Sequence, residues 1–212
     1  DGTETFRRIQ IEDASQIVDF NPEIAAPSGL PEETNPPKGD EAGKETSEEF
    51  EDLFFFDPQE ITPGTKVSIL LPEGVYTGDV QGGVSHGYGT FRSPDGATYT
   101  GTWRNGKREG FGKIEWPDGS WYEGAWKDNQ ISGEGTLVKV SGDNYKGNFS
   151  QDAFHGQGTY TWSNGDVYSG NWLSGKPHGL GIFFGSQETY SGEWFEGMRH
   201  GVGIAEWTNG DS

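Results

Sequence analysis

Four histidines are the side chains of this chain best suited to zinc binding or proton transfer. Each stands ten residues after a tyrosine that opens a repeated phrase, and Glu109 and Ser132 take that place in the other two copies. Successive copies would lie one β-hairpin apart, about 9–10 Å, too far for ligands that must lie about 2 Å from a shared zinc ion. We therefore interpret them as turn residues that hydrogen-bond locally. The four are His86, His155, His178 and His200.

Other patterns that could carry chemistry are weaker. Gly-x-Gly recurs along the chain, but no Gly-Lys-Ser/Thr follows it, as a phosphate loop would require. There is no Gly-x-Ser-x-Gly phrase for a nucleophilic serine. The neighbouring carboxylates Glu48 and Glu49 lie in an acidic stretch and are interpreted as solvated. The sequence therefore predicts no catalytic residue, no metal site and no cofactor.

The repeated phrase decides the architecture. Six tyrosines recur every 23 residues, with a last interval of 22: Tyr76, Tyr99, Tyr122, Tyr145, Tyr168 and Tyr190. If each tyrosine is position 0, positions 2, 11 and 13 are always glycine and position 4 is usually aromatic. A fixed period of this kind indicates stacked repeats, in which a recurring side chain serves packing more often than chemistry.

Two turn signals divide each copy into two strands. Position 7 is Gly, Asn or Asp, residues that tolerate a left-handed backbone. A second signal follows near the end of five copies, as Asp-Gly, Asn-Gly or, at Ser141-Gly142, Ser-Gly. Because side chains alternate along a strand, positions 0, 2 and 4 share one face, as do positions 11, 13, 15 and 17 of the return strand. We expect the strand glycines to leave room for an aromatic ring to lie flat on the backbone.

Residues 99–112 give the phrase most clearly, and it resembles the motif of the MORN (membrane occupation and recognition nexus) repeat family. The resemblance covers residues 76–212 and implies an all-β fold, a single-layer elongated antiparallel sheet of about six stacked β-hairpins with one grooved face. The expected repeats are 76–98, 99–121, 122–144, 145–167, 168–189 and 190–212. Val80, Asn129, Asp152 and a one-residue deletion near Gly185 depart from the motif, and we expect local irregularity there.

Charge is concentrated before the repeats. The net charge is −19, and residues 1–73 hold 18 acidic and 5 basic side chains, a balance of −13. This disfavours general binding to nucleic acid or anionic lipid. No cysteine is present, and no apolar run approaches the roughly 20 residues of a membrane-spanning helix. Because the chain begins with Asp and ends inside a repeat, we expect it to be a fragment of a longer protein.

The extension divides into three expected segments. Residues 1–20 are the end of an upstream region or a docking segment, residues 21–57 an acidic, largely disordered linker, and residues 58–75 a lead-in strand or cap. The linker carries an acidic aromatic motif that either caps the first repeat or recruits a partner. Its apolar members are Phe50, Leu53, Phe54, Phe55 and Phe56.

The favoured function is a non-catalytic scaffold for a protein partner, because solenoids present long surfaces and aromatic side chains concentrate binding energy. The expected contact residues, which can equally be core, are Trp103, Phe111, Tyr122, Trp126, Tyr145, Phe149, Phe154, Tyr168 and Trp172. Phe111, Phe154 and Leu180 are expected at hairpin tips on the same face, as cleaner probes of binding. A homodimer through exposed strand edges is a further expectation.

Two alternatives stay open. Arg104, Lys107, Arg108 and Lys113 could bind an anion such as a phosphoinositide head group, pair with the chain's own acidic extension, or simply be solvated at a hairpin tip. The chain could also be the regulatory domain of an enzyme whose catalytic part lies outside it, as the family resemblance allows.

The acidic lead-in and the repeats are also similar to the carboxy-terminal part of plant chloroplast-division proteins that join an FtsZ-like domain to MORN repeats. That resemblance implies a module in the chloroplast stroma that binds another division-ring component and governs where FtsZ assembles. Otherwise we expect a cytoplasmic or membrane-peripheral location.

Overall fold

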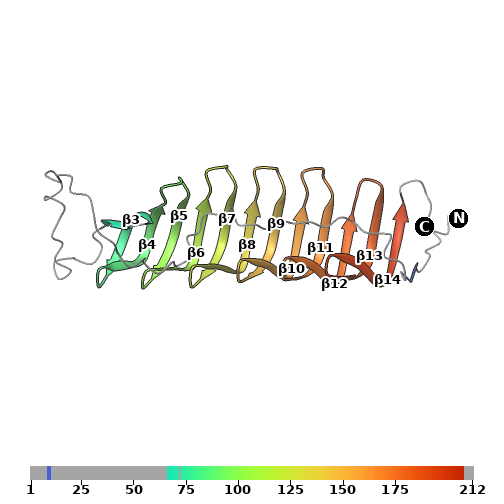
Figure 1. Cartoon of the computed structure of the whole chain (residues 1–212). Helices are drawn as coiled ribbons and strands as arrows, with labels where there is room; N and C mark the ends of the chain where they lie inside the picture. The colour runs from blue at the N-terminus through green and yellow to red at the C-terminus, as the bar shows by residue number, and fades with distance from the viewer. Residues whose placement is uncertain (1–8, 11–65, 72, 208–212) are drawn as a thin grey trace, which may run out of the picture.

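The computed structural model describes residues 9–10, 66–71 and 73–207, which form one 14-stranded antiparallel sheet (Figure 1). From β2 onward each strand pairs with the strand before it in the chain, and β1 joins the far edge, with Ile9 opposite Gly203 of β14. Within the described residues, no helix is long and apolar enough to cross a membrane. The strands are β1 (Ile9–Gln10), β2 (Val67–Leu71), β3 (Gly74–Gln81), β4 (Val84–Arg92), β5 (Thr98–Arg104), β6 (Lys107–Glu115), β7 (Trp121–Lys127), β8 (Gln130–Val138), β9 (Asn144–Ser150), β10 (Ala153–Thr161), β11 (Val167–Leu173), β12 (Lys176–Phe184), β13 (Glu188–Phe195) and β14 (Met198–Trp207).

The elongated all-β sheet of stacked hairpins is confirmed. Strands β3 to β14 form six hairpins, each opened by one of the six tyrosines, and β2 lies where a lead-in strand was expected. The linker of residues 21–57, with its acidic aromatic motif, lies outside the described residues. Of residues 1–20, only Ile9 and Gln10 are described, and their pairing with β14 brings the start of the chain to the last repeat.

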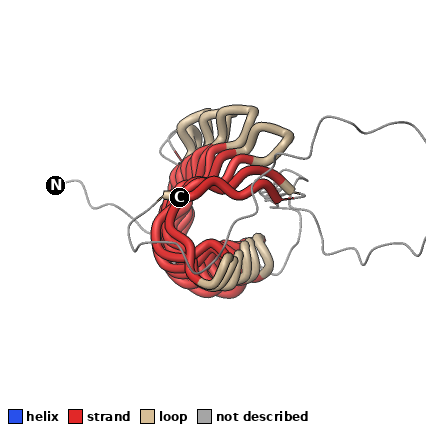
Figure 2. Tube along the Cα trace, turned by 90° about the vertical axis from the view of Figure 1, so that its left-hand side faces the viewer, coloured by secondary structure: helices blue, strands red, loops and turns tan. Residues whose placement is uncertain are grey.

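Seen from its end, the sheet curls into a C (Figure 2). The curl follows from a bulge in each hairpin: in the second repeat Gly101 lies opposite Gly112, yet Trp103 lies opposite Arg108, so residues 109–111 face Thr102 alone. The Thr102 hydroxyl accepts a hydrogen bond from the backbone N–H of Phe111 at 3.0 Å. We call the concave inner face of this C the gutter. The half of each hairpin that ends in a tight turn is the tight-turn arm, and the half that ends in a wide turn is the wide-turn arm.

The two arms take their names from two kinds of turn. The tight turns place two successive residues in the left-handed region, such as Asn105 (φ 50°) and Gly106 (φ 81°), which confirms the prediction for position 7. The wide turns span about five residues and place one glycine there, as at Gly96 (φ 97°). The wide turn at Gly185 is shorter, as the deletion implies.

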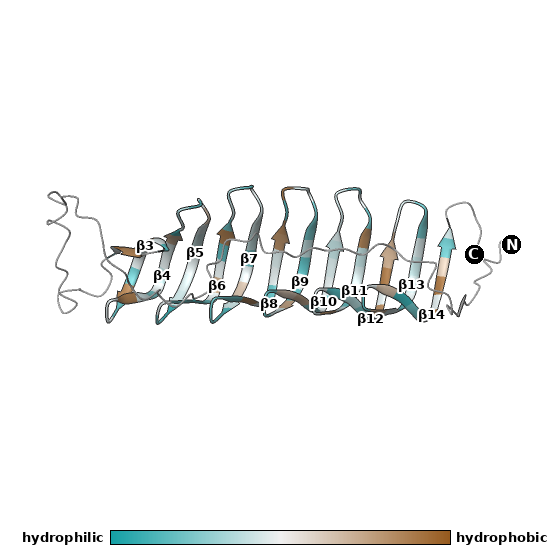
Figure 3. Ribbon diagram, in the orientation of Figure 1, coloured by the Kyte–Doolittle hydropathy of each residue, from teal (hydrophilic) through white to brown (hydrophobic). Residues whose placement is uncertain are grey.

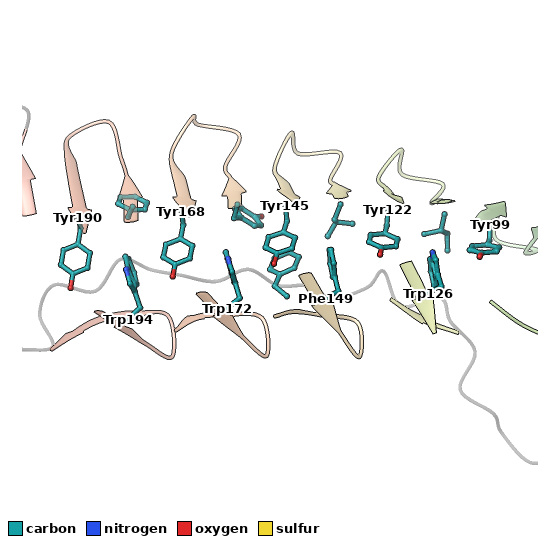
Figure 4. Close-up of a cluster of buried hydrophobic side chains, with 14 of the residues drawn as sticks. Tyr99, Tyr122, Trp126, Tyr145, Phe149, Tyr168, Trp172, Tyr190 and Trp194 are labelled. Atoms are coloured by element: carbon teal, nitrogen blue, oxygen red, sulfur yellow. The ribbon is translucent and has the colours of Figure 1, made fainter. Parts of the chain in front are cut away.

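The core is a ladder of aromatic rings that runs the length of the gutter (Figure 4). Tyrosines project from one arm, and the tryptophans and Phe149 project from the other. Each tryptophan at position 4 meets the tyrosines of its own and the preceding repeat edge-on, as Trp126 does with Tyr122 at 5.5 Å and Tyr99 at 5.1 Å. Hydrophobic and hydrophilic residues alternate along the whole array (Figure 3). The buried hydrophobic side chains form one cluster, and the ladder makes up most of it.

Glycines at positions 2 and 13 make the ladder possible. A Cβ on Gly112 would lie 2.3 Å from the Tyr99 hydroxyl oxygen and 2.5 Å from ring carbon Cζ, so the tyrosine ring occupies the space of the missing side chain. The expectation that an aromatic ring lies on the glycine backbone is confirmed.

Hydrogen bonds tie each repeat to the one before it. The indole N–H of Trp126 donates to the carbonyl of Gly112 at 3.1 Å, and Trp172 does the same to Gly158 at 3.0 Å. In the tight turns the N–H of Asn129 donates to the carbonyl of Arg108, and its side-chain Oδ1 accepts from the Arg108 N–H at 2.8 Å. The departure from glycine at this turn therefore adds a bond between repeats.

Replacing Asn129 with alanine is expected to lower the free energy of unfolding by about 1–2 kcal/mol, because alanine loses this bond and fits poorly at φ 71°. Glycine at the same position keeps the backbone geometry and should cost less. Urea unfolding of the two variants checks this; equal losses for alanine and glycine would contradict it.

Candidate functional site

Most of the aromatic residues expected to contact a partner form the ladder itself. Within the gutter none of them is more than 9% exposed: Trp103, Tyr122, Trp126, Tyr145, Phe149, Phe154, Tyr168 and Trp172. Phe154 is not at a tip, as the sequence analysis expected; it is fully buried and stacks on Tyr145 at 3.7 Å. These rings therefore form the core beneath the gutter surface, and little of them is available for contact with a partner.

Phe111 and Leu180 lie on the opposite face, which corrects the expectation that they share the face of the ladder. They are 60% and 66% exposed, because position 12 points outward, next to the inward glycine at position 13. Phe111 borders a shallow outer hollow whose lining includes Trp121, Glu134 and Lys146. This lining includes side chains of both charges.

The ladder tyrosines are poor candidates for proton transfer near neutral pH. Burial raises the pKa of Tyr76 to about 12, and it raises the pKa of Tyr99 and Tyr145 further in the same direction. The Tyr99 hydroxyl donates to the carbonyl of Thr102 at 3.0 Å, and the other ladder tyrosines repeat this bond three residues on. Their hydroxyl groups serve the fold.

The histidines occupy equivalent places in their repeats. His178 and His200 both lie beside the ring of Phe195, at 5.3 and 5.6 Å between centroids. In the part of the chain that the structure describes, no group of three or more His, Asp or Glu side chains could hold a metal ion.

The side chains that differ most along the gutter stand at position 9, which we call the gutter row. Phe154 lies against Tyr145 of its own repeat and Trp172 of the next, and Arg108 lies in the same way near Tyr99 and Trp126. The sequence interpretation missed this row because it considered only what the repeats share, although strand alternation with the inward glycine at position 13 already placed it inside. Its members are Ser85, Arg108, Ile131, Phe154, Pro177 and Arg199.

Arg108 brings a charge into the gutter. Its guanidinium carbon lies 4.6 Å from the Trp126 ring centroid and 5.7 Å from that of Tyr99. Burial lowers the pKa of this guanidinium, while Tyr99 and Asp152 act in the opposite direction. Among the described residues, no carboxylate lies within ion-pair distance of it.

Arg199 stands at the same position of the last repeat and is paired. Its two terminal nitrogens donate to the two carboxylate oxygens of Glu188, and its side chain is only 3% exposed over the ring of Tyr190. Glu188 begins β13 at the wide-turn end, so the ion pair bridges the two arms. In the second repeat the residue equivalent to Glu188 is Ala97, and no carboxylate replaces it.

The other cations of the predicted basic cluster lie outside the gutter and have partners within the array. Arg104 lies 3.8 Å from Glu109, Lys107 3.1 Å from Asp128 and Lys113 2.6 Å from Glu115. Strand alternation separates Lys107 from Arg108, so the four side chains do not form one anion site. This arrangement weakens the case for a lipid head group.

Comparison with known families agrees with the geometry. The model of the MORN repeat matches residues 76–98, 99–121, 122–144, 145–167, 168–187 and 190–212, more than half of the chain. The chain belongs to the MORN repeat family. A search of curated proteins finds no match, so no relative there supports the resemblance to chloroplast-division proteins. MORN repeats are a non-enzymatic module that generally mediates protein or membrane interactions.

Proposed function

We propose that this chain is a non-catalytic scaffold that holds an extended peptide of a protein partner along the gutter. The observation that carries the proposal is that Arg108 and Ile131, the two partly exposed members of the gutter row, differ in size and charge on an otherwise uniform aromatic ladder. A rigid support with a variable lining suits recognition of one peptide sequence in one register. The alternative of a phosphoinositide-binding module has less support, because three of its four expected cations are paired within the array.

Photo-crosslinking tests where a partner binds. A photoreactive phenylalanine analogue at Ile131 in the gutter row is expected to capture a partner protein from a cell extract, whereas the same analogue at Ile182 on the outer face should capture little of it. Both side chains are aliphatic and each is at least partly exposed, so the pair is matched in chemistry. Capture from Ile182 alone would overturn the proposal, and so would enrichment of anionic lipid in place of protein.

A finer form of the proposal is a role in chloroplast division, in which the module binds another division-ring component in the stroma and regulates FtsZ placement. The acidic lead-in and the six repeats support it by resemblance. Identification of a division-ring protein by the crosslink at Ile131 is the outcome this form requires. A homodimer would use the edge of β2, since β1 already pairs with part of the β14 edge.

A further inference from the structure

Arg108 is held in a fixed position in the gutter, and no carboxylate among the described residues forms an ion pair with it. Its backbone is fixed by the two hydrogen bonds to Asn129, and its guanidinium is held against the ring of Trp126. Removing a charge from water is costly unless it is paired. Arg108 is half-buried and has no described carboxylate within ion-pair distance, although Asp152 acts on it from further away, so its setting suits an anion supplied from elsewhere.

The last repeat offers a comparison for the kind of anion that fits. At the equivalent position Arg199 receives a two-oxygen contact from Glu188, which reaches across the gutter from the opposite arm. Arginine binds carboxylates in this forked geometry especially well. In the second repeat Ala97 leaves that place free, so a carboxylate from a segment lying in the gutter can take the position that Glu188 holds in the sixth.

The gutter near Arg108 also offers contacts for apolar side chains. Six of the partly buried hydrophobic residues that pack on the ladder lie in the first three repeats or on the lead-in strand: Ile69, Leu71, Val80, Phe91, Trp116 and Ile131. A segment that fits this end of the gutter therefore combines at least one carboxylate with several apolar, preferably aromatic, side chains.

The chain itself contains such a segment. Residues 48–57 carry five carboxylates, four phenylalanines and a leucine, with no basic residue. Ten residues lead from Asp57 to Val67 of β2, enough for about 34 Å of extended chain. Arg108 lies four strands from β2, about 19 Å across the sheet. The segment can therefore reach Arg108, and its covalent attachment gives it a high effective concentration there.

We propose that residues 48–57 occupy the gutter over the first three repeats and place one carboxylate on Arg108. The segment then uses the same gutter as the partner peptide of the proposed function, and the two compete for it. A partner must displace the segment, which makes the acidic aromatic motif a built-in determinant of binding affinity.

Paramagnetic NMR on the full chain tests this. Because the chain has no cysteine, Ser47→Cys provides a single site for a nitroxide label beside the segment. Amide signals of β4 to β8 are expected to broaden strongly, while those of β12 to β14 keep their intensity. Arg108→Leu, which keeps apolar packing on Trp126, should restore at least half of the lost intensity.

Arg104→Leu is the matched control, since it removes the same charge from the same repeat outside the gutter, and it should leave the broadening unchanged. The spectra also report whether each variant is folded. No broadening in β4 to β8, or equal recovery with both variants, would overturn the proposal. Broadening that appears only when labelled and isotope-enriched chains are mixed would assign the segment to a second copy and would also overturn it. The measurement uses no partner, so its failure leaves the proposed function standing.

Discussion

Replacing Gly112 with alanine is expected to lower the free energy of unfolding by about 3 kcal/mol, a large fraction of the stability of an ordinary domain. The new methyl group would lie 2.3–2.6 Å from three atoms of Tyr99. That ring cannot move aside, because its hydroxyl is bonded to the carbonyl of Thr102 and tryptophan rings lie on both sides, at 5.2 and 5.1 Å. Urea unfolding followed by tryptophan fluorescence measures the loss.

Gly106→Ala is the control for this prediction. Gly106 has φ 81° in a tight turn with open space around its Cα, so alanine there meets only backbone strain, about 1 kcal/mol. Gly112 has no positive φ, and its requirement for glycine is entirely one of space. If Gly112→Ala is no more destabilising than Gly106→Ala, the packing of the tyrosine ring on the glycine backbone is not what holds the repeat together.

The turn glycine Gly106 and the strand glycine Gly112 illustrate which parts of the fold could be predicted from the sequence. Turns and strand faces depend on a few adjacent residues, so Asn105-Gly106 predicts a left-handed turn and the alternation around Tyr99 predicts an inward ring. Because the same signals recur in six repeats, a departure from the motif in one repeat, such as Val80 in place of an aromatic residue, does not change the predicted fold. The strands, their order and the glycine–tyrosine contact therefore followed from the sequence.

The curl of the sheet and the lining of the gutter were not predicted from the sequence. The bulge at residues 109–111 depends on cross-strand register, which a list of recurring positions does not contain. Arg108 was grouped with Arg104 and Lys107 because they are close in sequence, although alternation puts Lys107 on the opposite face. Phe154 was placed at a hairpin tip, although alternation puts position 9 inside the gutter, where it is buried. The pairing of Ile9 with Gly203 joins opposite ends of the chain and leaves no local signal.

Alkaline pH is expected to unfold the array sharply between about pH 10 and 12, and this is the largest effect that we predict. Burial raises the pKa of seven tyrosines in the folded array: Tyr76, Tyr99, Tyr122, Tyr145, Tyr160, Tyr168 and Tyr190. In the unfolded chain each ionises near pH 10. Above that pH the unfolded chain releases protons that the folded chain retains, so stability is fully present below pH 10 and falls as the pH rises.

The loss is steep because the tyrosines act together. Each buried tyrosine that stays protonated contributes a slope of up to about 1.4 kcal/mol per pH unit, so seven could remove several kcal/mol within one unit. Tyrosinate absorbance and circular dichroism should therefore change at the same pH, since the rings ionise only when the ladder opens. Tyr122→Phe should reduce the slope by about one proton, at the cost of the hydrogen bond to Ala125. Ionisation of most tyrosines before any loss of strand signal would mean that the rings are accessible in the folded array, and the aromatic ladder would then be a surface open to partners and not the core.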